Sequence, residues 1–418
     1  MDDAVVELRI ESLGARGDGI AQDDAGVIYV PYSAPGDRVA ATVSGRRGDA
    51  RLARVDALLQ PGPDRVEPPC RHFGTCGGCA VQHLNESTYG KWKLDILCQA
   101  LARRDLGDIA IAEMITVPPA SRRRARFAAL RTGKGVQLGY NAAGSHKIVD
   151  LAESHILRPK IVALLDGLRA LLRDLLAEGR RADVQVTETE TGLDLWLVAD
   201  LPHNAQNDMR LADFAQETDL ARLSIGTRPE VAFVRRAARV TFSGVPVTPP
   251  PDGFLQASRA GEEALVRLVR QGVGDGGNIA DLFAGVGTFS FALGNGVKVL
   301  AVEGAEEQAE ALIAGRNTAR RSGIEVAVRD LDRRALSVGE LAAFDAVVFD
   351  PPRAGAARQV EAMAASNVPT VVAVSCNPAT FARDAATLVD GGYRMLSLTP
   401  VDQFPWSRHL ELVATFQR

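Results

Sequence analysis

The 418-residue chain has no stretch of about 20 apolar residues free of charge, and a membrane-spanning helix requires such a stretch. Its first residues, Met1-Asp2-Asp3-Ala4, also lack the basic start and apolar run of a secretory signal. Neither sign of charge is in large excess, since the formal net charge at pH 7 is −4. We therefore expect a cytoplasmic protein with no membrane partner, in which any binding of a polyanion depends on a local basic patch.

Cysteine is scarce and unevenly placed. The chain has five, at Cys70, Cys76, Cys79, Cys98 and Cys376. An odd number in a chain expected to be cytoplasmic argues against a framework of disulfides. Three of the five are crowded together, whereas Cys376 lies far along the chain in a different context. We treat these as two separate candidate sites.

The remaining composition is that of a globular protein. Hydrophobic residues make up 46% and charged residues 24% of the chain, which excludes extensive disorder. Its length predicts about two to three domains. Proline-rich joints at Pro61-Gly62-Pro63 and Pro249-Pro250-Pro251 are plausible domain boundaries.

We predict three domains. Residues 1–58 read as four or five short strands with glycine-rich turns, which is typical of a small β-barrel. Residues 59–245 mix helix and strand patterns and predict an α+β domain. Helical patterns run from Ser87 to about Arg104 and from Ile161 to Leu176. In residues 246–418 strands alternate with helices, which predicts an α/β domain with a doubly wound parallel sheet. Its strands are expected at 278–282, 297–302, 324–328, 345–349 and 369–374, followed by two C-terminal strands.

A glycine-rich turn follows the first strand of this last domain. The segment Asp281-Leu282-Phe283-Ala284-Gly285-Val286-Gly287-Thr288-Phe289 ends a strand and opens a helix, and its glycines let the backbone approach a ligand closely. The next strand ends in Glu303, where an acid can accept hydrogen bonds from a ribose. A third glycine, which a dinucleotide fingerprint needs, is missing. From this fragment alone NAD stays open, but S-adenosylmethionine, which has no pyrophosphate, fits better.

Two further strands bring reactive groups to the same edge of the sheet. One ends in Asp350-Pro351-Pro352-Arg353, and an acid on a proline-stiffened loop suits a planar amide edge such as a nucleobase. An amino-group methyltransferase would use a similar loop. The next strand ends in Ser375-Cys376-Asn377-Pro378. A thiol is needed if the target is a pyrimidine carbon, because C5 becomes nucleophilic only after a nucleophile adds to C6.

The same chemistry needs a base that removes the C5 proton. Near the C-terminus, His409-Leu410-Glu411 offers two candidates. We expect both to lie on one strand, where their side chains would share a face.

From Gln256 to Glu411 the chain resembles the RNA 5-methyluridine methyltransferases. The resemblance is carried by Gly253-Phe254-Leu255-Gln256, the glycine-rich turn, Val302-Glu303-Gly304, Asp350-Pro351-Pro352-Arg353-Ala354-Gly355, Ser375-Cys376-Asn377-Pro378 and His409-Leu410-Glu411. Residues 1–58 resemble the TRAM barrel, an OB-like RNA-binding module that many members carry. Ala284 departs from the family pattern, in which cysteine is usual at this position.

The resemblance implies a class I methyltransferase fold, Rossmann-like, with S-adenosylmethionine as cofactor and RNA as partner. It implies Cys376 as the nucleophile and Glu411 as the base. The barrel and the cysteine cluster favour 23S rRNA as the substrate, with tRNA as the alternative, and we expect a monomer. The cofactor contacts implied are Gln256, Phe283, Thr288, Glu303, Asp330 and Asp350.

The spacing Cys70-x5-Cys76-x2-Cys79 is typical of metal ligands. In the family that it resembles, three such cysteines join a fourth to hold a [4Fe-4S] cluster. At the place of the fourth this chain has Ser154. Cys98 and His155 are candidates for the vacancy, and a three-cysteine site or zinc with a histidine also stays open.

The segment Ser121-Arg122-Arg123-Arg124-Ala125-Arg126-Phe127 packs four arginines and an aromatic into seven residues. Arginine binds phosphate bidentately and stacks on bases, so this run is a candidate RNA contact. On a strand its members point to opposite faces, and we expect only some to reach RNA. The competing function is a non-catalytic RNA-binding or iron–sulfur protein. The presence of both Cys376 and Glu411 disfavours it.

Overall fold

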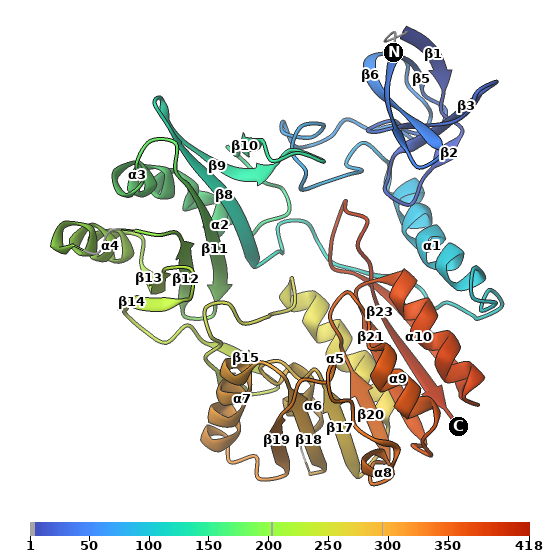
Figure 1. The fold of residues 1–418 in the computed structure, drawn as a ribbon, viewed down its shortest axis with the longest axis vertical. Helices are drawn as coiled ribbons and strands as arrows, with labels where there is room; N and C mark the ends of the chain where they lie inside the picture. The colour runs from blue at the N-terminus through green and yellow to red at the C-terminus, as the bar shows by residue number, and fades with distance from the viewer. Residues whose placement is uncertain (1–4, 202–203, 295) are drawn as a thin grey trace.

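The computed structural model describes residues 5–201, 204–294 and 296–418. Three bodies surround a central junction: a small β-sheet unit at the N-terminal end, a sheet with helices in the middle of the chain, and a layered α/β unit at the C-terminal end (Figure 1). Among the helices of the described ranges, none is long and apolar enough to cross a membrane.

The N-terminal unit is one strongly curved sheet with a separate small core. Buried aliphatic side chains such as Ile28, Val30 and Val39 fill it. The sheet order is β1-β5-β6-β4-β3-β2, so that β4 lies beside β6 and the two hairpins close on each other. Its strands are β1 (Val5–Arg9), β2 (Ser12–Leu13), β3 (Gly19–Asp23), β4 (Gly26–Val30), β5 (Arg38–Arg47) and β6 (Ala50–Gln60).

The middle unit is a seven-stranded sheet of order β10-β9-β8-β11-β12-β13-β14, with helices packed on it. The helical stretch 161–176 forms two helices, α2 (Pro159–Ala163) and α3 (Leu165–Leu175), and the leucines of α3 face the sheet. The other elements are β8 (Arg124–Thr132), β9 (Gly135–Asn141), β10 (Ile148–Asp150), β11 (Arg181–Thr189), β12 (Gly192–Val198), α4 (Ala205–Glu217), β13 (Leu220–Ile225) and β14 (Glu230–Val234). The hairpin β15 (Val240–Phe242) and β16 (Val245–Val247) leads into the last unit.

The C-terminal unit has the α/β sheet that the sequence predicts, in the order β19-β18-β17-β20-β21-β23-β22-β7. Strands β17 to β21 are parallel, and β23 runs antiparallel between β21 and β22. The elements are α5 (Arg259–Val273), β17 (Asn278–Leu282), α6 (Thr288–Leu293), β18 (Lys298–Glu303), α7 (Glu306–Thr318), β19 (Ile324–Val328), α8 (Val338–Leu341), β20 (Ala346–Phe349), α9 (Ala357–Ala364), β21 (Thr370–Ser375), α10 (Pro378–Asp390), β22 (Arg394–Asp402) and β23 (Glu411–Gln417). The predicted strands and helices of this unit are confirmed.

Two elements from before residue 121 join the C-terminal unit. Helix α1 (Glu86–Ala102), which Asn85 caps by accepting from the Thr88 amide, packs on α10. Its Leu97 and Leu101 share one hydrophobic core with the strands of the C-terminal sheet. Strand β7 (Ile115–Thr116) pairs with β22 and extends that sheet. The chain thus contacts the C-terminal unit before it enters the middle one, and the three-domain division stays a prediction.

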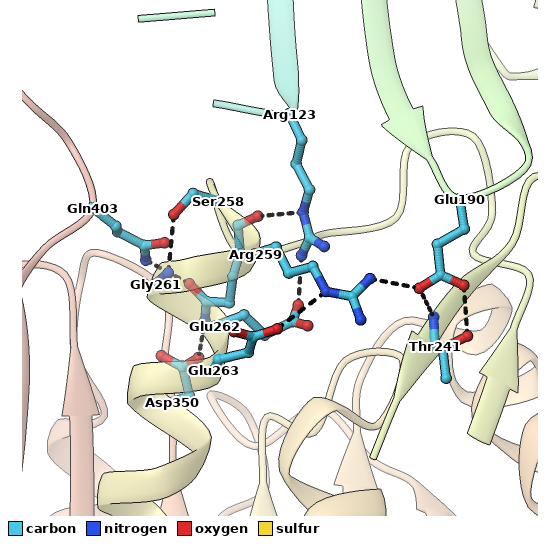
Figure 2. A network of polar contacts seen from close by, with 11 residues as sticks. Arg123, Glu190, Thr241, Ser258, Arg259, Gly261, Glu262, Glu263, Asp350 and Gln403 are labelled. Carbon is cyan, nitrogen blue, oxygen red and sulfur yellow. Dashed lines mark hydrogen bonds and ion pairs between the residues drawn. The ribbon is translucent and has the colours of Figure 1, made fainter. Parts of the chain in front are cut away.

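A network of ion pairs joins the middle sheet to the start of α5 (Figure 2). Arg123 donates to the Gln256 carbonyl at 3.0 Å and pairs with Glu262, and both charged side chains are buried. Arg259 links Glu190 to Glu263 on the surface. Buried pairs of this kind hold a fixed geometry when both partners are hydrogen-bonded. They fix the segment around Gln256, which is a predicted site residue.

Candidate active site

The turn between β17 and α6 has the backbone of a ligand cradle. Phe283, Gly285 and Gly287 all have positive φ, at 62°, 57° and 98°. A Cβ on Gly287 would lie 2.6 Å from the Phe291 ring, so only glycine fits there. At Gly285 the nearest atom to such a Cβ is Oε1 of Gln308 at 3.8 Å, so the backbone faces open space.

The acid at the end of β18 organises this cradle. Each Glu303 carboxylate oxygen accepts one backbone N–H at 2.7 Å, from Gly285 and from Ala305. Asp330 lies beside Gly304, because a Cβ on that glycine would be 3.4 Å from the Asp330 Cα. Four of the residues predicted to contact the cofactor therefore surround the same end of the sheet: Phe283, Thr288, Glu303 and Asp330.

Burial of carboxylates next to the cradle suits a cationic ligand. Asp281 is fully buried, which raises its pKa to about 7, and Ser290 donates to one of its oxygens. Its other oxygen has no hydrogen-bond partner within the described ranges. A buried acceptor without a partner is costly unless a ligand satisfies it. These observations fit a nucleoside cofactor that carries positive charge.

Cys376 lies at the edge of the sheet next to the predicted acid. It directly follows β21, and Asp350 directly follows the neighbouring parallel strand β20. The half-buried thiol lines a cavity of about 330 Å³, together with Arg353, Asn377 and His409. Burial raises the pKa of the Cys376 thiol to about 11, and the carboxylates of Glu411 and Asp350 add to the rise. The Arg353 guanidinium acts in the opposite direction.

Glu411 is the first residue of β23, which is paired with β21, and it is 2% exposed. Burial raises its pKa to about 7. Gln403 donates to the Glu411 carboxylate at 3.1 Å and to the side-chain oxygen Oε1 of Gln256 at 2.7 Å. Gln256 in turn donates to Asp350 at 3.1 Å. Two amide side chains therefore connect the predicted base to the predicted cofactor acid.

The expectation for His409 was wrong in its placement. Because β23 begins at Glu411, His409 lies in the preceding loop and does not share a strand face with it. The His409 ring packs edge-on to Phe404, with centroids 6.0 Å apart. Burial, and then the nearby Arg353 and Arg408 charges, lower the pKa of His409 to about 4. At neutral pH Glu411 is therefore the stronger base of the two.

Sequence reasoning missed two residues of this site, Gln403 and Lys93. Lys93 on α1 is fully buried and donates to Asp402 at 2.8 Å and to the carbonyls of Phe404 and His409. It anchors the loop that carries Gln403 and leads into Glu411. A lysine within a helix is ordinarily solvated. No feature of the sequence marks this one as buried.

Comparison with known proteins agrees with the resemblance found in the sequence. A family model described as tRNA (Uracil-5-)-methyltransferase matches residues 252–418. An uncharacterised RNA methyltransferase of Rhizobium meliloti (strain 1021) is 41% identical over 98% of each chain. The 23S rRNA (uracil(1939)-C(5))-methyltransferase RlmD of Chromohalobacter salexigens is 34% identical over all of this chain and 90% of its own. The chain belongs to the RNA uracil-C5 methyltransferase family.

A solved structure extends this family assignment to the fold. The Pyrococcus abyssi tRNA (uracil-54, C5)-methyltransferase in complex with S-adenosyl-L-homocysteine is 25% identical, with a TM-score of 0.77. The match covers 98% of this chain and 99% of that one. The predicted class I methyltransferase fold and the predicted family are confirmed.

The cysteine loop of this family member, residues 70–79, lies at the junction of the three bodies. The Gly77 amide donates to the Asn141 carbonyl of the middle unit, and the Ala80 amide to the Trp406 carbonyl of the C-terminal unit. Phe73 packs edge-on to Tyr32 of the N-terminal unit, with centroids 5.2 Å apart. Burial raises the pKa of the Cys79 thiol to about 12, and Cys76 and Cys70 add to the rise.

The described ranges contain no cluster of three His, Cys, Asp or Glu side chains that could hold a metal ion. Cys98 is exposed on α1, and His155 lies 3.7 Å from Glu153. Ser154 directly follows two residues that are hydrogen-bonded to the cysteine loop. The Arg71 amide donates to the Glu153 carboxylate, and the Ala152 amide donates to the His72 ring. These residues do not form a complete ligand set for a four-cysteine cluster, and we assign no reaction step to a metal.

The arginine run is divided among several roles. Arg123 is in the buried pair with Glu262, and Arg126 pairs with Asp183. Arg122 lines a cavity beside the active site. Around the active site, several cations make no ion pair with any described residue, and each lines a cavity near the junction: Arg16, Arg103, Lys147, Arg353 and Arg408. The family member thus has a local basic region despite its net charge of −4.

Proposed function

We propose that this protein transfers a methyl group from S-adenosylmethionine to C5 of a uracil in RNA, with 23S rRNA as the substrate. The observation that carries the proposal is the placement of Cys376 and Glu411 at the ends of two paired strands, beside Asp350 and Gln256. A thiol and a base at one edge of the sheet are what addition to C6 and removal of the C5 proton require.

In the proposed reaction the Cys376 thiol loses its proton to solvent, and its sulfur forms a bond to C6 of the uracil. Electron density moves to C5 and the C4 carbonyl, which makes C5 nucleophilic. S-adenosylmethionine, when bound, supplies the methyl group. Glu411 then takes the C5 proton, the C6–S bond breaks, and the C5–C6 double bond is restored with the thiolate as leaving group.

Residues around Cys376 and Glu411 position these two groups and favour their reactive forms. Arg353 is the cation that favours the Cys376 thiolate. Gln403 holds the Glu411 carboxylate by donating to it, and through Gln256 it is connected to Asp350. The residues that would hold the cofactor are Gln256, Phe283, Thr288, Glu303, Asp330 and Asp350.

Two observations support 23S rRNA over tRNA. The RlmD relative matches this chain over its full length at 34% identity, whereas the tRNA enzyme of known structure is 25% identical. The N-terminal unit, which resembles the TRAM barrel, meets the cysteine loop, and a cavity of about 800 Å³ between them is lined by Arg16, Arg47 and Lys147. Cations in a cleft favour the RNA backbone.

We also propose that Cys70, Cys76 and Cys79 bind an iron–sulfur cluster, and we assign it no fourth protein ligand. The spacing of the three thiols along the chain supports it. The cluster has no part in the proposed chemistry. It would hold the loop that joins the three bodies.

The function is tested by mapping 5-methyluridine in 23S rRNA and tRNA from cells with and without the gene. We expect one uridine of 23S rRNA to lose its methyl group in the deletion strain. Loss at a tRNA position instead would establish the tRNA alternative, and no change in either RNA would contradict the function.

The purified protein provides the mechanistic test. Cys376→Ala is expected to abolish methyl transfer while binding of S-adenosylmethionine, measured by calorimetry, is retained. RNA that contains 5-fluorouridine should trap a covalent complex with the wild type but not with this variant. Cys98→Ala, which removes an exposed thiol on α1, is the matched control and should leave both assays unchanged. Turnover by Cys376→Ala would refute the nucleophile.

A further inference from the structure

A second cavity, of about 210 Å³, lies beside the Cys376 cavity. We call it the Phe404 cavity. Arg353 and His409 line both cavities, so the two are direct neighbours with these side chains between them. The steps proposed above leave it without a role. Its other lining residues are Gly78, Arg122, Tyr140, Ile156, Phe404, Pro405 and Ser407.

The walls of the Phe404 cavity present flat surfaces. The guanidinium carbon of Arg122 lies 5.9 Å from the centre of the Phe404 ring, and the His409 ring meets Phe404 edge-on. Tyr140 adds a third ring. Unstacked bases of single-stranded RNA bind by stacking on aromatic rings, histidine and arginine planes. A phosphate would suit the two arginines but would make no use of the ring surfaces that line the cavity.

Polar groups at the edges of the cavity are free to form hydrogen bonds with a base. The His409 ring nitrogens, the Tyr140 hydroxyl and the Arg353 guanidinium make no hydrogen bond to any described part of the chain. His409 is neutral at pH 7, because burial lowers its pKa to about 4. A neutral imidazole offers one donor and one acceptor, which matches the edge of an uncharged base.

The cavity is formed before any RNA binds. Lys93 holds the carbonyls of Phe404 and His409, which fixes the loop that carries both rings. On the opposite side, a Cβ on Gly78 would lie 3.3 Å from the Tyr140 ring and 3.4 Å from the Cys76 sulfur. The glycine therefore lets the cysteine loop close against Tyr140. A site held from both sides loses little conformational freedom on binding.

We propose that the Phe404 cavity binds an unstacked nucleobase, that of the nucleotide directly next to the target uridine in the same RNA strand. Adjacency follows from the two side chains that the cavities share. The proposal rests on the proposed function, because it takes the target uracil to occupy the Cys376 cavity. The protein thus reads two consecutive bases, and the second one contributes to the choice of site.

The test uses a synthetic RNA fragment that carries the uridine identified by mapping. In two further fragments, the nucleotide before or after this uridine is replaced by an abasic ribose. With the wild type we expect kcat/KM to fall about 5- to 100-fold for one of the two abasic fragments, as the loss of one stacked base predicts. For the other abasic fragment, kcat/KM should be close to the value for the intact RNA.

Variants connect this effect to the cavity. Phe404→Leu should lower kcat/KM on the intact fragment by a similar factor. This variant should then have the same kcat/KM on the intact fragment and on the sensitive abasic fragment. Arg122→Gln, which removes the guanidinium that lies over the Phe404 ring, provides a second variant in case Phe404→Leu is unstable. Phe233→Leu, on β14 of the middle sheet, is the matched control and should behave as the wild type. Binding of S-adenosylmethionine should be unchanged in all three.

The outcomes separate the two proposals. If the wild type methylates the intact fragment but neither abasic change affects kcat/KM, the second base site is refuted and the function stands. Equal sensitivity to abasic RNA in the wild type and in both cavity variants also refutes it. If the wild type does not methylate the intact fragment at all, the proposed function itself fails.

Discussion

At the scale of the single residue, burial raises the pKa of both reacting side chains, Cys376 and Glu411. The pKa of Cys376 rises to about 11, so its thiol is protonated at neutral pH in the free protein. The pKa of Glu411 rises to about 7, which places it where a carboxylate can both accept and release a proton. A raised pKa makes Glu411 a stronger base than an exposed glutamate, because desolvation disfavours its charged form.

Glu411→Gln should separate methyl transfer from product release. The amide keeps the shape but has no basicity, so methylation proceeds and elimination slows by about 100-fold or more. A methylated covalent RNA–protein complex should accumulate, visible as a denaturation-resistant band that carries label from the cofactor. Normal turnover would remove Glu411 from the mechanism. Absence of any adduct would move it to substrate binding.

The pH dependence of elimination follows from the same residue. The base form of Glu411 increases as pH rises through about 7, so decay of the adduct should accelerate between pH 6 and pH 8 and then level off. Rapid-quench measurement of adduct decay checks this. The slow residual decay of Glu411→Gln should lack the inflection near pH 7. An identical inflection in the variant would assign it to another group.

At the scale of the element, the loop from Asp402 to Leu410 depends on a helix that is distant in sequence. Lys93 and Tyr89 on α1 both donate to Asp402, and the Trp406 amide donates to the Tyr89 hydroxyl. Burial lowers the pKa of Lys93, whereas Asp402 acts in the opposite direction. The position of Gln403 and of the Phe404 cavity therefore depends on one buried ion pair.

Lys93→Met should lower the free energy of unfolding by about 3–5 kcal/mol, because it leaves the Asp402 carboxylate buried without its cation. Urea denaturation monitored by tryptophan fluorescence measures this. The double variant Lys93→Met/Asp402→Asn should recover a large part of the loss, since it removes the unpaired charge. Lys91→Met on the same helix is exposed and serves as the control. Equal stability of Lys93→Met and Lys91→Met would contradict the anchoring role.

At the scale of the whole molecule, the cysteine loop is where the three bodies meet. It contacts the N-terminal unit through Phe73, the middle sheet through Gly77 and the C-terminal loop through Ala80. Cavities lined by unpaired cations lie on either side of it. A bound cluster would stabilise this junction, because metal binding to the folded state adds to its stability.

Anaerobically purified protein is expected to contain iron and acid-labile sulfide. Cys76→Ser should lose both, and removal of the metal should lower the melting temperature. Ser154→Cys supplies a fourth thiolate and should raise the iron content or its resistance to oxygen, whereas Cys98→Ser should change neither. Elemental analysis and visible absorption check this. Zinc without sulfide would replace the cluster by a zinc site, and neither metal would refute the proposal.

The local pattern of the sequence was sufficient for most elements of the C-terminal unit. Asn278–Leu282 and Ile324–Val328 are strands with the predicted bounds. The prediction for His409 was wrong, although two residues that are two positions apart on a strand do share a face. His409 is not on the strand, because the pairing of β23 with β21 begins only beside Leu412. The helical stretch 161–176 divides at Leu164, which the continuous apolar pattern does not reveal.

The sequence by itself determined the fold class and the residue types of the site, because these depend on local patterns, and the resemblance of its motifs to the RNA 5-methyluridine methyltransferases indicated the family. Only the tertiary structure decided that Gln403 holds the base, that Lys93 anchors the loop before it, and that Arg122 rather than Arg123 reaches the cavity beside Cys376. Those facts arise from packing between segments that are far apart in the sequence, such as Lys93 and His409, which are separated by 316 residues. Burial and the direction of a side chain depend on what packs against it, and no short stretch of sequence contains that information.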